Sequence, residues 1–195
     1  MGHITVLLKT RASVRQFQPQ PVPPGVLADI LEAGRLSPSG GNEQPWRFGV
    51  ITDPALIADL AQLAYRQTWM AQAPLLIVLC ITPVSDEAGG RDIQAQRYPE
   101  QAAAIRQMEP ALYWALNQEE HQTKIAGTHM LLAALEQGVG GCWVSRFDVR
   151  AVARRLNLPR NILPAEILAL GYPARSPKPL RKKPLKEIVF YNALT

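Results

Sequence analysis

The 195-residue chain contains few of the residues from which covalent cross-links and metal sites are built. It has two cysteines, Cys80 and Cys142, and three histidines, His3, His121 and His129. Both cysteines lie in apolar stretches without CxxC spacing, which favours two buried free thiols over a disulfide or a metal site. No pair of histidines has the spacing of zinc ligands. The sequence therefore indicates neither a disulfide framework nor a metal centre.

Long hydrophobic runs are also absent. Apolar residues make up 47% of the chain, but no run reaches the roughly 18 residues that a membrane-spanning helix needs. The longest run, residues 73–81, is typical of a buried strand, and residues 1–10 carry no signal-peptide cleavage pattern. We therefore expect one soluble, cytoplasmic domain over residues 1–195.

Aromatic residues are scarce, at 7%, and they do not interleave with the positive charges. The formal net charge is +5, and basic residues gather near both ends of the chain, as Lys9, Arg11 and Arg15 and as Arg175, Lys178, Arg181, Lys182, Lys183 and Lys186. A nucleic-acid binder would combine such charges with stacking aromatics or a recognition motif, so this class is disfavoured. The two basic clusters either converge on one anion or form solvated faces.

Helices and strands are expected to alternate along the chain. Apolar spacing predicts helices over residues 25–36, 54–67, 124–137 and 149–156, and strands over residues 48–52, 74–81, 142–144, 167–171 and 187–191. Asp148 is placed to cap the helix that follows it. Residues 83–122 change in composition, and we interpret them as partly helical and partly exposed. This alternation predicts an α/β or α+β sandwich.

Residues 10–17, with the sequence TRASVRQF, alternate polar and apolar positions. An extended backbone would place Arg11, Ser13 and Arg15 on one side. Two guanidiniums and a hydroxyl make a good receptor for phosphate or another polar anion. An edge that faces water is the alternative, and the octapeptide alone favours it.

A second polar stretch, SPSGGNEQPWRF, covers residues 37–48. Gly40 and Gly41 allow close approach of the backbone to a ligand. Ser39, Asn42 and Gln44 add donors and acceptors on a turn stiffened by flanking prolines. The combination suits a flat heteroaromatic ligand with polar edge atoms. A structural turn is the alternative, although it does not explain so many hydrogen-bonding groups.

The stretches RASVRQF, SPSGGNEQPWRF, QAPLLIVLC, GVGGCW and PLKEIVFYN occur in this order and resemble the nitroreductase family of FMN-dependent oxidoreductases. The resemblance covers the chain except residues 83–122. It implies an α+β fold, a three-layer sandwich whose central, mostly antiparallel sheet is flanked by helices. It also implies a homodimer with FMN at the subunit interface and a C-terminal strand extended onto the partner. Residues 83–122 would be a variable, lid-like segment.

The resemblance also implies roles for individual residues. Arg11 and Ser13 would reach the FMN phosphate or the ribityl chain, and Arg15 would lie near the pyrimidine end of the flavin. Arg181 and Lys182 resemble a C-terminal basic pair that closes on the phosphate. The two basic clusters would then meet on one dianion.

Further matches concern the flavin ring. The partner subunit would contribute Pro38, Ser39, Gly40 and Asn42. Gln67 resembles a family position whose amide contacts the flavin. Ser145 and Arg146 resemble positions whose backbone groups lie near the isoalloxazine edge. Arg146 stands where a small residue is frequent, and it either enters the pocket or alters access to the flavin. Arg66 replaces a frequent Asn, and Leu180 a frequent basic residue.

The implied reaction is a ping-pong transfer. NADH or NADPH would pass a hydride to N5 of tightly bound FMN, and a nitroaromatic, a quinone or a similar acceptor would then take it. No side chain is needed as nucleophile or base, and Arg15 would stabilise the reduced flavin. Alternatives are an FMN-binding protein without turnover, or a reductive dehalogenase or flavin-cleaving enzyme. The sequence leaves the acceptor and the nicotinamide preference open. Tyr113 and Trp114 either stack on an acceptor or belong to the core.

Overall fold

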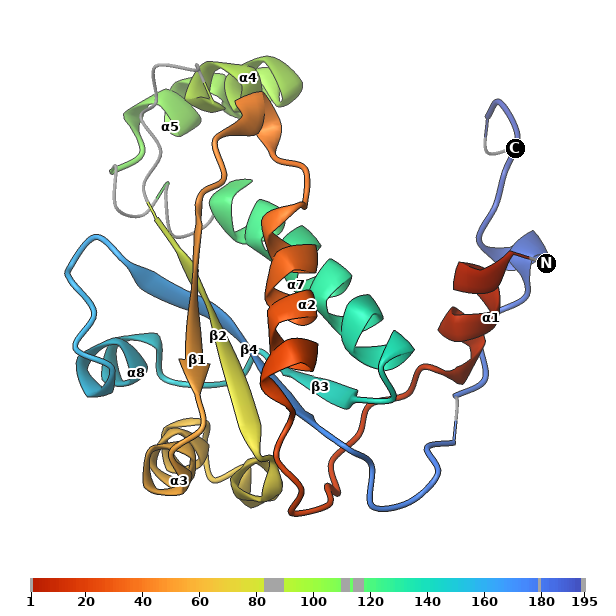
Figure 1. Cartoon of the computed structure of the whole chain (residues 1–195). Coiled ribbons are helices and arrows are strands. Elements are labelled where there is room, and N and C mark those ends of the chain that lie inside the picture. Colours follow the sequence, from red (N-terminus) through yellow and green to blue (C-terminus); the bar gives the residue numbers. More distant parts are fainter. Residues whose placement is uncertain (1, 83–89, 110–112, 114–117, 179, 194–195) are drawn as a thin grey trace.

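The computed structural model describes residues 2–82, 90–109, 113, 118–178 and 180–193. One sheet of four antiparallel strands, in the order β1-β2-β4-β3, lies between helices (Figure 1). Its strands are β1 (Trp46–Ile51), β2 (Leu75–Ile81), β3 (Gly140–Val144) and β4 (Leu163–Gly171). The predicted α+β sandwich with a central antiparallel sheet is therefore confirmed.

Helices precede, connect and follow these strands. The α-helices are α1 (His3–Thr10), α2 (Pro24–Arg35), α3 (Pro54–Leu63), α4 (Gly90–Arg97), α5 (Ala102–Gln107), α7 (Gln118–Glu136) and α8 (Val149–Arg155). Short 3-10 turns are η1 (Gly40–Asn42), η2 (Thr68–Gln72), η4 (Pro99–Gln101) and η5 (Leu185–Glu187). Among the described residues, none of the helices is both long and apolar enough to cross a membrane.

Local signals explain several helix ends. Pro24 and Pro54 each occupy the first helical position, where the missing N–H costs nothing. Asp148 caps α8 as predicted, since its Oδ1 accepts from the backbone N–H of Ala151 at 2.8 Å. Gly138 follows α7 with a φ of +73°, a conformation that favours glycine.

Strand β2 separates two hydrophobic cores. Every residue of this strand is buried, and successive side chains alternate between the faces of the sheet. Leu75, Ile77 and Leu79 pack toward α2 and α7, whereas the core around Leu76 and Val78 lies under α3 and α8. The continuous apolar run thus follows from a strand that is covered on both sides.

Helix α7 approaches the sheet closely at Gly127. A Cβ atom built there would lie 2.5 Å from Cη2 of Trp143 and would also meet the side chain of Leu79. Both neighbours belong to the core under α2 and α7. This helix can therefore lie so close to the sheet only because residue 127 is a glycine.

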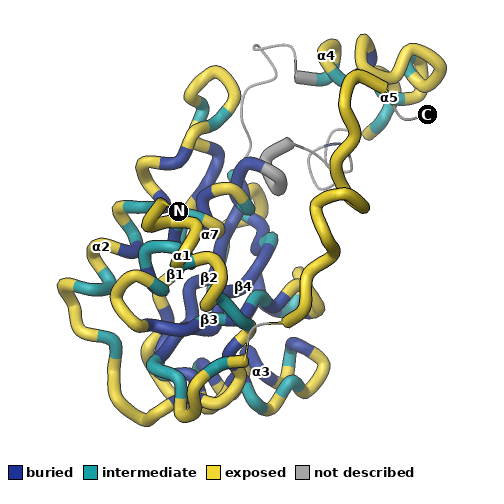
Figure 2. The backbone as a smooth tube through the Cα atoms, turned by 90° about the vertical axis from the view of Figure 1, so that its right-hand side faces the viewer, coloured by how far each residue is buried: buried dark blue, intermediate teal, exposed yellow. Residues whose placement is uncertain are grey.

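Four predicted elements differ clearly from the observed ones, and two of them begin earlier than predicted: α7 begins at Gln118 instead of residue 124, and β4 begins at Leu163 instead of residue 167. The helix predicted over residues 54–67 ends at Leu63, because the next residues bend away in left-handed conformations. The strand predicted over residues 187–191 is absent from the single chain, which forms η5 and then irregular backbone. A strand needs a neighbouring edge, and no described residue elsewhere in the chain pairs as a strand with the exposed C-terminal arm, residues 180–193 (Figure 2).

The segment predicted to vary, residues 83–122, contains α4, η4, α5 and the start of α7. Tyr113 is buried there, with the guanidinium of Arg91 at 4.7 Å from its ring centre, so its ring is not a free stacking surface. Trp114 lies outside the described residues.

We predict that Gly127→Ala lowers the free energy of unfolding by about 1–2 kcal/mol, because overpacking outweighs the gain in helix propensity. Gly25→Ala is the matched control, since a Cβ atom at Gly25 meets nothing within 4 Å. The control should raise stability by up to about 1 kcal/mol. Urea unfolding at fixed protein concentration measures both changes. Equal effects of the two substitutions would contradict the close approach of α7.

Candidate functional site

An extended segment continues the sheet beyond β3. Ser13 forms a parallel bridge with Gly141, and the backbone N–H of Val14 donates to the carbonyl of Gly141 at 3.1 Å. Phe17 bridges Pro173 farther along. Val14 and Phe17 are buried, whereas Ser13 is exposed. The apolar side chains therefore anchor the segment and leave its polar side chains toward solvent.

Glycines on β3 permit this packing. A Cβ atom at Gly140 would lie 2.6 Å from Cγ2 of Val14, and one at Gly141 would lie 2.5 Å from Cδ2 of Leu131. Real side chains do not approach so closely. The GVGG stretch thus keeps room for the N-terminal segment on one side and for α7 on the other.

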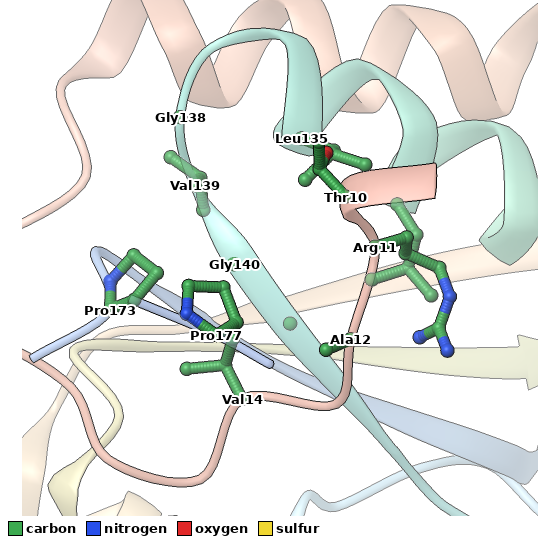
Figure 3. Close-up of a pocket in the computed structure, with 12 residues that line it drawn as sticks. Thr10, Arg11, Ala12, Val14, Leu135, Gly138, Val139, Gly140, Pro173 and Pro177 are labelled. Carbon is green, nitrogen blue, oxygen red and sulfur yellow. The ribbon is translucent and has the colours of Figure 1, made fainter. Parts of the chain in front are cut away.

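Two shallow hollows border the segment. The first, about 160 Å³, is lined mainly by apolar residues, among them Val14, Leu135 and Val139. Figure 3 shows Pro173 and Pro177 on one side of this hollow and Arg11 on the other, with its guanidinium turned away from the prolines. The half-buried Arg11 thus presents its charge at the margin of an apolar depression.

The second hollow, about 170 Å³, brings the two basic clusters together. Ser13 and Arg15 line it from the N-terminal segment, and Arg175 and Lys178 line it from the chain after β4. None of the described residues around it is acidic. Three cations and hydroxyl groups without a carboxylate between them form a receptor for a multiply charged anion.

The predicted pair Arg181 and Lys182 lies farther along the exposed C-terminal arm. Neither residue makes a hydrogen bond or an ion pair with another described residue. In the single chain, Arg175 and Lys178 therefore occupy the place beside Ser13 that the sequence analysis gave to Arg181 and Lys182.

Arg15 also stacks on an aromatic ring. Its guanidinium carbon lies 5.6 Å from the ring centre of Trp69, a cation–π contact. Cys142 lies beneath this part of the site. Burial raises the pKa of its thiol, and this rise is partly offset by the charge of Arg15 and a hydrogen bond with Ser13. Burial raises the pKa of Cys80, in β2, to about 12. Both thiols are free and buried, as predicted.

Gln67 connects the end of α3 with the exit of β3. Its Nε2 donates to the carbonyl of Ala64 at 3.1 Å and to that of Arg146 at 3.0 Å. Between these bonds, Tyr65 and Arg66 adopt positive φ values of 55° and 59°. Two successive residues in this conformation store strain, which such long-range bonds must hold in place.

Arg146 and Ser145 follow β3 directly, and both are exposed. The guanidinium carbon of Arg146 lies 5.0 Å from the ring centre of Tyr65. Arg146 makes no ion pair with any described residue. Its side chain therefore rests on an exposed ring, and its donors remain available.

The glycine turn lies at another corner of the molecule. The backbone N–H of Gly40 donates to Oε1 of the buried Gln122, and Ser37 Oγ lies 2.8 Å from Nδ1 of His129, so α7 fixes both ends of the turn. Within the turn, Ser39 Oγ accepts from the backbone of Gln44 at 2.9 Å. Pro38 and Asn42 are exposed, and Asn42 has a φ of +56°. Figure 1 shows the turn that follows α2 well apart from residues 11–17 below α1.

Several site residues escaped the sequence analysis. Trp69 and Tyr65 support arginines that are distant in sequence, and Gln122 holds the glycine turn. No local pattern identifies such pairs. The only signal in the sequence was that Tyr65 and Trp69 flank Gln67, close to Arg66, which replaces a frequent Asn.

The geometry suits an elongated ligand with an anionic end. Ser13, Arg175 and Lys178 lie near the start of β3, and Gln67 and Arg146 lie at its exit. The five residues of β3 span roughly 16 Å. Arg15 and Trp69 stand between these ends. Cations at one end, and amide and aromatic groups at the other, fit a phosphate joined to a flat polar ring.

The fold is an α+β sandwich, and the set of donors at the edge of its sheet suits an elongated anionic ligand. The chain belongs to the nitroreductase family, whose family model matches residues 8–172, and it is therefore an oxidoreductase. It is 32% identical, over 96% of its length, to an NADH dehydrogenase of Thermus thermophilus and covers 95% of that protein. It is 26% identical to an iodotyrosine deiodinase of Thermotoga neapolitana, over 95% of this chain and 96% of that one.

Solved structures agree on the fold. The NADPH:FMN oxidoreductase from Vibrio harveyi complexed with NAD⁺ superimposes with a TM-score of 0.77. The alignment covers 100% of this chain and 79% of that one at 21% identity. This likeness supports the three-layer arrangement.

Proposed function

We propose that the protein is an FMN-dependent oxidoreductase that passes a hydride from NADH or NADPH to a nitroaromatic, a quinone or a similar acceptor. One observation carries the proposal: two basic clusters from opposite ends of the chain meet in one hollow lined by Ser13, Arg15, Arg175 and Lys178. Such a hollow suits a phosphate dianion. A flavin mononucleotide carries this group at one end of a planar redox ring.

The residues along β3 fit FMN in order. Arg11 and Ser13, with Arg175 and Lys178, would hold the phosphate and the ribityl chain. The amide of Gln67 and the backbone of Ser145 and Arg146 would lie along the ring. Bound FMN would supply the redox chemistry, by accepting a hydride at N5 and donating it to the acceptor. The chain's own groups bind and orient the ring, and none of them is needed as a nucleophile.

Arg15 would tune the redox chemistry. Its guanidinium is held over Trp69 and makes no ion pair with a described residue, so its charge is available to a ligand. Negative charge develops at the pyrimidine end of a flavin on reduction. A fixed cation near that end stabilises the reduced form.

The same proposal requires a homodimer. The turn with Pro38, Ser39, Gly40 and Asn42 is remote from residues 11–17 of its own chain, so it can reach a flavin only in a second subunit. α7 holds this turn through Gln122, which keeps it shaped before binding.

Exposed apolar groups supply the surface for such an association. The C-terminal arm exposes Ile188, Phe190 and Tyr191, the last at 85%. Strand β1 is an edge strand, and beside it lies a hollow of about 580 Å³ lined by residues that include Trp46 and Phe48. Docking of the partner's arm on this edge would bury apolar surface and complete the sheet.

A second candidate is an FMN-binding protein without turnover, which requires a blocked flavin. The position of Arg146 favours the enzyme, because its guanidinium carbon lies 5.0 Å from the ring centre of the exposed Tyr65. The family also includes the iodotyrosine deiodinase above, so reductive dehalogenation remains the alternative reaction on the same cofactor.

Purified protein should show the yellow absorption of a flavin, and anaerobic NADH or NADPH should bleach it. Bleaching by one nucleotide identifies the preferred donor, and reoxidation by a nitroaromatic or a quinone identifies the acceptor class. If neither nucleotide bleaches the yellow colour, the protein binds FMN without turnover. Colourless protein that FMN does not reconstitute would refute the proposed function.

We predict that Arg15→Ala lowers the flavin midpoint potential by about 30 mV. The reason is that a charge-assisted hydrogen bond contributes about 1.5 kcal/mol, and 30 mV corresponds to about 1.4 kcal/mol for a two-electron couple. Reduction by NAD(P)H should slow in parallel. Arg160→Ala removes the same charge from an exposed loop and should leave the potential unchanged. Equal potentials in both variants would exclude the tuning role of Arg15.

We predict that deletion of residues 185–195 dissociates the dimer and weakens FMN retention. Size-exclusion chromatography with light scattering measures the mass, and absorption measures the bound flavin. The control deletion removes residues 193–195 only and spares the exposed apolar residues Ile188–Tyr191. A shortened chain that stays dimeric with full flavin content would contradict the docking of the arm.

A further inference from the structure

We propose that Arg146, held over the ring of Tyr65, is a receptor for the anionic group of the substrate that reacts at the exit end of β3. This inference rests on the proposed function and extends it to substrate selection. The ligand chemistry is a phosphate or a carboxylate. It belongs to a molecule other than the cofactor.

The contact orients the guanidinium without consuming its charge. The guanidinium carbon lies 5.0 Å from the ring centre, and Tyr65 is 58% exposed. A guanidinium carries its N–H groups in its own plane, and a cation–π contact does not neutralise its charge. Arg146 has no ion pair with any described residue. The nearest acid in sequence, Asp148, instead caps α8 through Ala151.

Hydrogen bonds of Gln67 hold the strained backbone that carries the Tyr65 ring. Tyr65 and Arg66 both adopt left-handed conformations, which cost non-glycine residues about 1–2 kcal/mol each. Tyr65 is exposed, so its ring does not repay this cost by entering the core. The two bonds of Gln67, to Ala64 and Arg146, lock the bend and tie the Tyr65 loop to the backbone of Arg146 itself.

The position of Arg146 separates its ligand from the cofactor phosphate. Ser13, Arg175 and Lys178 converge near the start of β3, whereas Arg146 follows its last residue. A strand of this length spans roughly 16 Å, and the single phosphate of FMN would be held near its start. The anion at Arg146 therefore comes from a second molecule. Arg66, next to Tyr65 in the sequence, is also exposed.

Two sources carry the required chemistry. The first is the 2′-phosphate that distinguishes NADPH from NADH, and the second is a carboxylate on the acceptor. A guanidinium binds either group through paired hydrogen bonds. Each source has an uncharged counterpart of nearly the same shape, so the two can be tested separately.

The experiment measures binding to the oxidised, flavin-containing protein by calorimetry. One arm compares NADP⁺ with NAD⁺, and the other compares 4-nitrobenzoate with 4-nitrobenzamide. Arg146→Gln should reduce the preference for the charged ligand about tenfold in one arm, because a charge-assisted hydrogen bond is lost. Arg146→Lys should retain part of this preference, since it keeps the charge and loses the planar donors.

Variants at the ring test the platform. Tyr65→Phe keeps an aromatic face and should behave as the unmodified protein, whereas Tyr65→Leu should lose most of the preference. Arg150→Gln is the matched control for charge, because Arg150 is exposed on α8 only four positions away. This control should leave both ratios unchanged.

The outcomes separate this inference from the proposed function. A fall in the NADP⁺/NAD⁺ arm assigns the receptor to the donor, and a fall in the nitrobenzoate arm assigns it to the acceptor. Flavin-containing Arg146→Gln protein with both ratios unchanged overturns the receptor and leaves the proposed function intact. Equal losses in Arg150→Gln and Arg146→Gln also overturn it, since they indicate a general field effect. Protein that cannot hold FMN contradicts the proposed function itself.

Discussion

The backbone N–H of Val14 donates to the carbonyl of Gly141 at 3.1 Å, and the other features of the site depend on the packing around this bond. The missing Cβ of Gly140 admits Val14, and the burial of Val14 turns the alternating polar residues outward. Arg175 and Lys178 then meet Ser13 and Arg15 because β4, which pairs with β3, delivers the following chain to the same edge. The missing side chain at Gly140 thus allows charges from both ends of the chain to meet at one edge of the sheet.

A second constraint acts at the opposite end of β3. The helix before Tyr65 stops at Leu63, and the following bend is held by a side-chain amide that reaches the carbonyl of Arg146, 79 positions away. The bend stores strain and exposes a large ring, so it contributes little to the core. Strain of this kind persists where surrounding contacts hold the backbone in an unfavourable conformation. Such places are concentrated at ligand sites. The two ends of β3 are therefore shaped by different means, by close packing at one and by hydrogen-bonded strain at the other.

The sequence predicted what local chemistry determines. The apolar run that became β2, the helix start at Pro54 and the cap at Asp148 each depend on neighbouring residues, and all three formed as expected. The end of α3 was wrong because it depends on Gln67 and a carbonyl distant in sequence. The contact of Arg15 with Trp69 has the same character, since no local pattern announces it. The resemblance indicated the family and the polar stretches. It did not indicate the residues that support these stretches, because those residues are distant in sequence.

The exposed C-terminal arm is consistent with the proposed homodimer. It was expected to form a strand, yet its backbone is irregular and its apolar side chains are exposed. A strand gains its hydrogen bonds only from a neighbouring edge, and among the residues that the structure describes β1 is an edge strand of the sheet. The glycine turn, rigidly held by Gln122, likewise stands away from the cations of its own chain. The edge of β1, the exposed apolar arm and the turn held by Gln122 are three separate features that suit a subunit interface. A second copy of the chain would complete all three, which is why cofactor binding and dimerisation are expected to be one event.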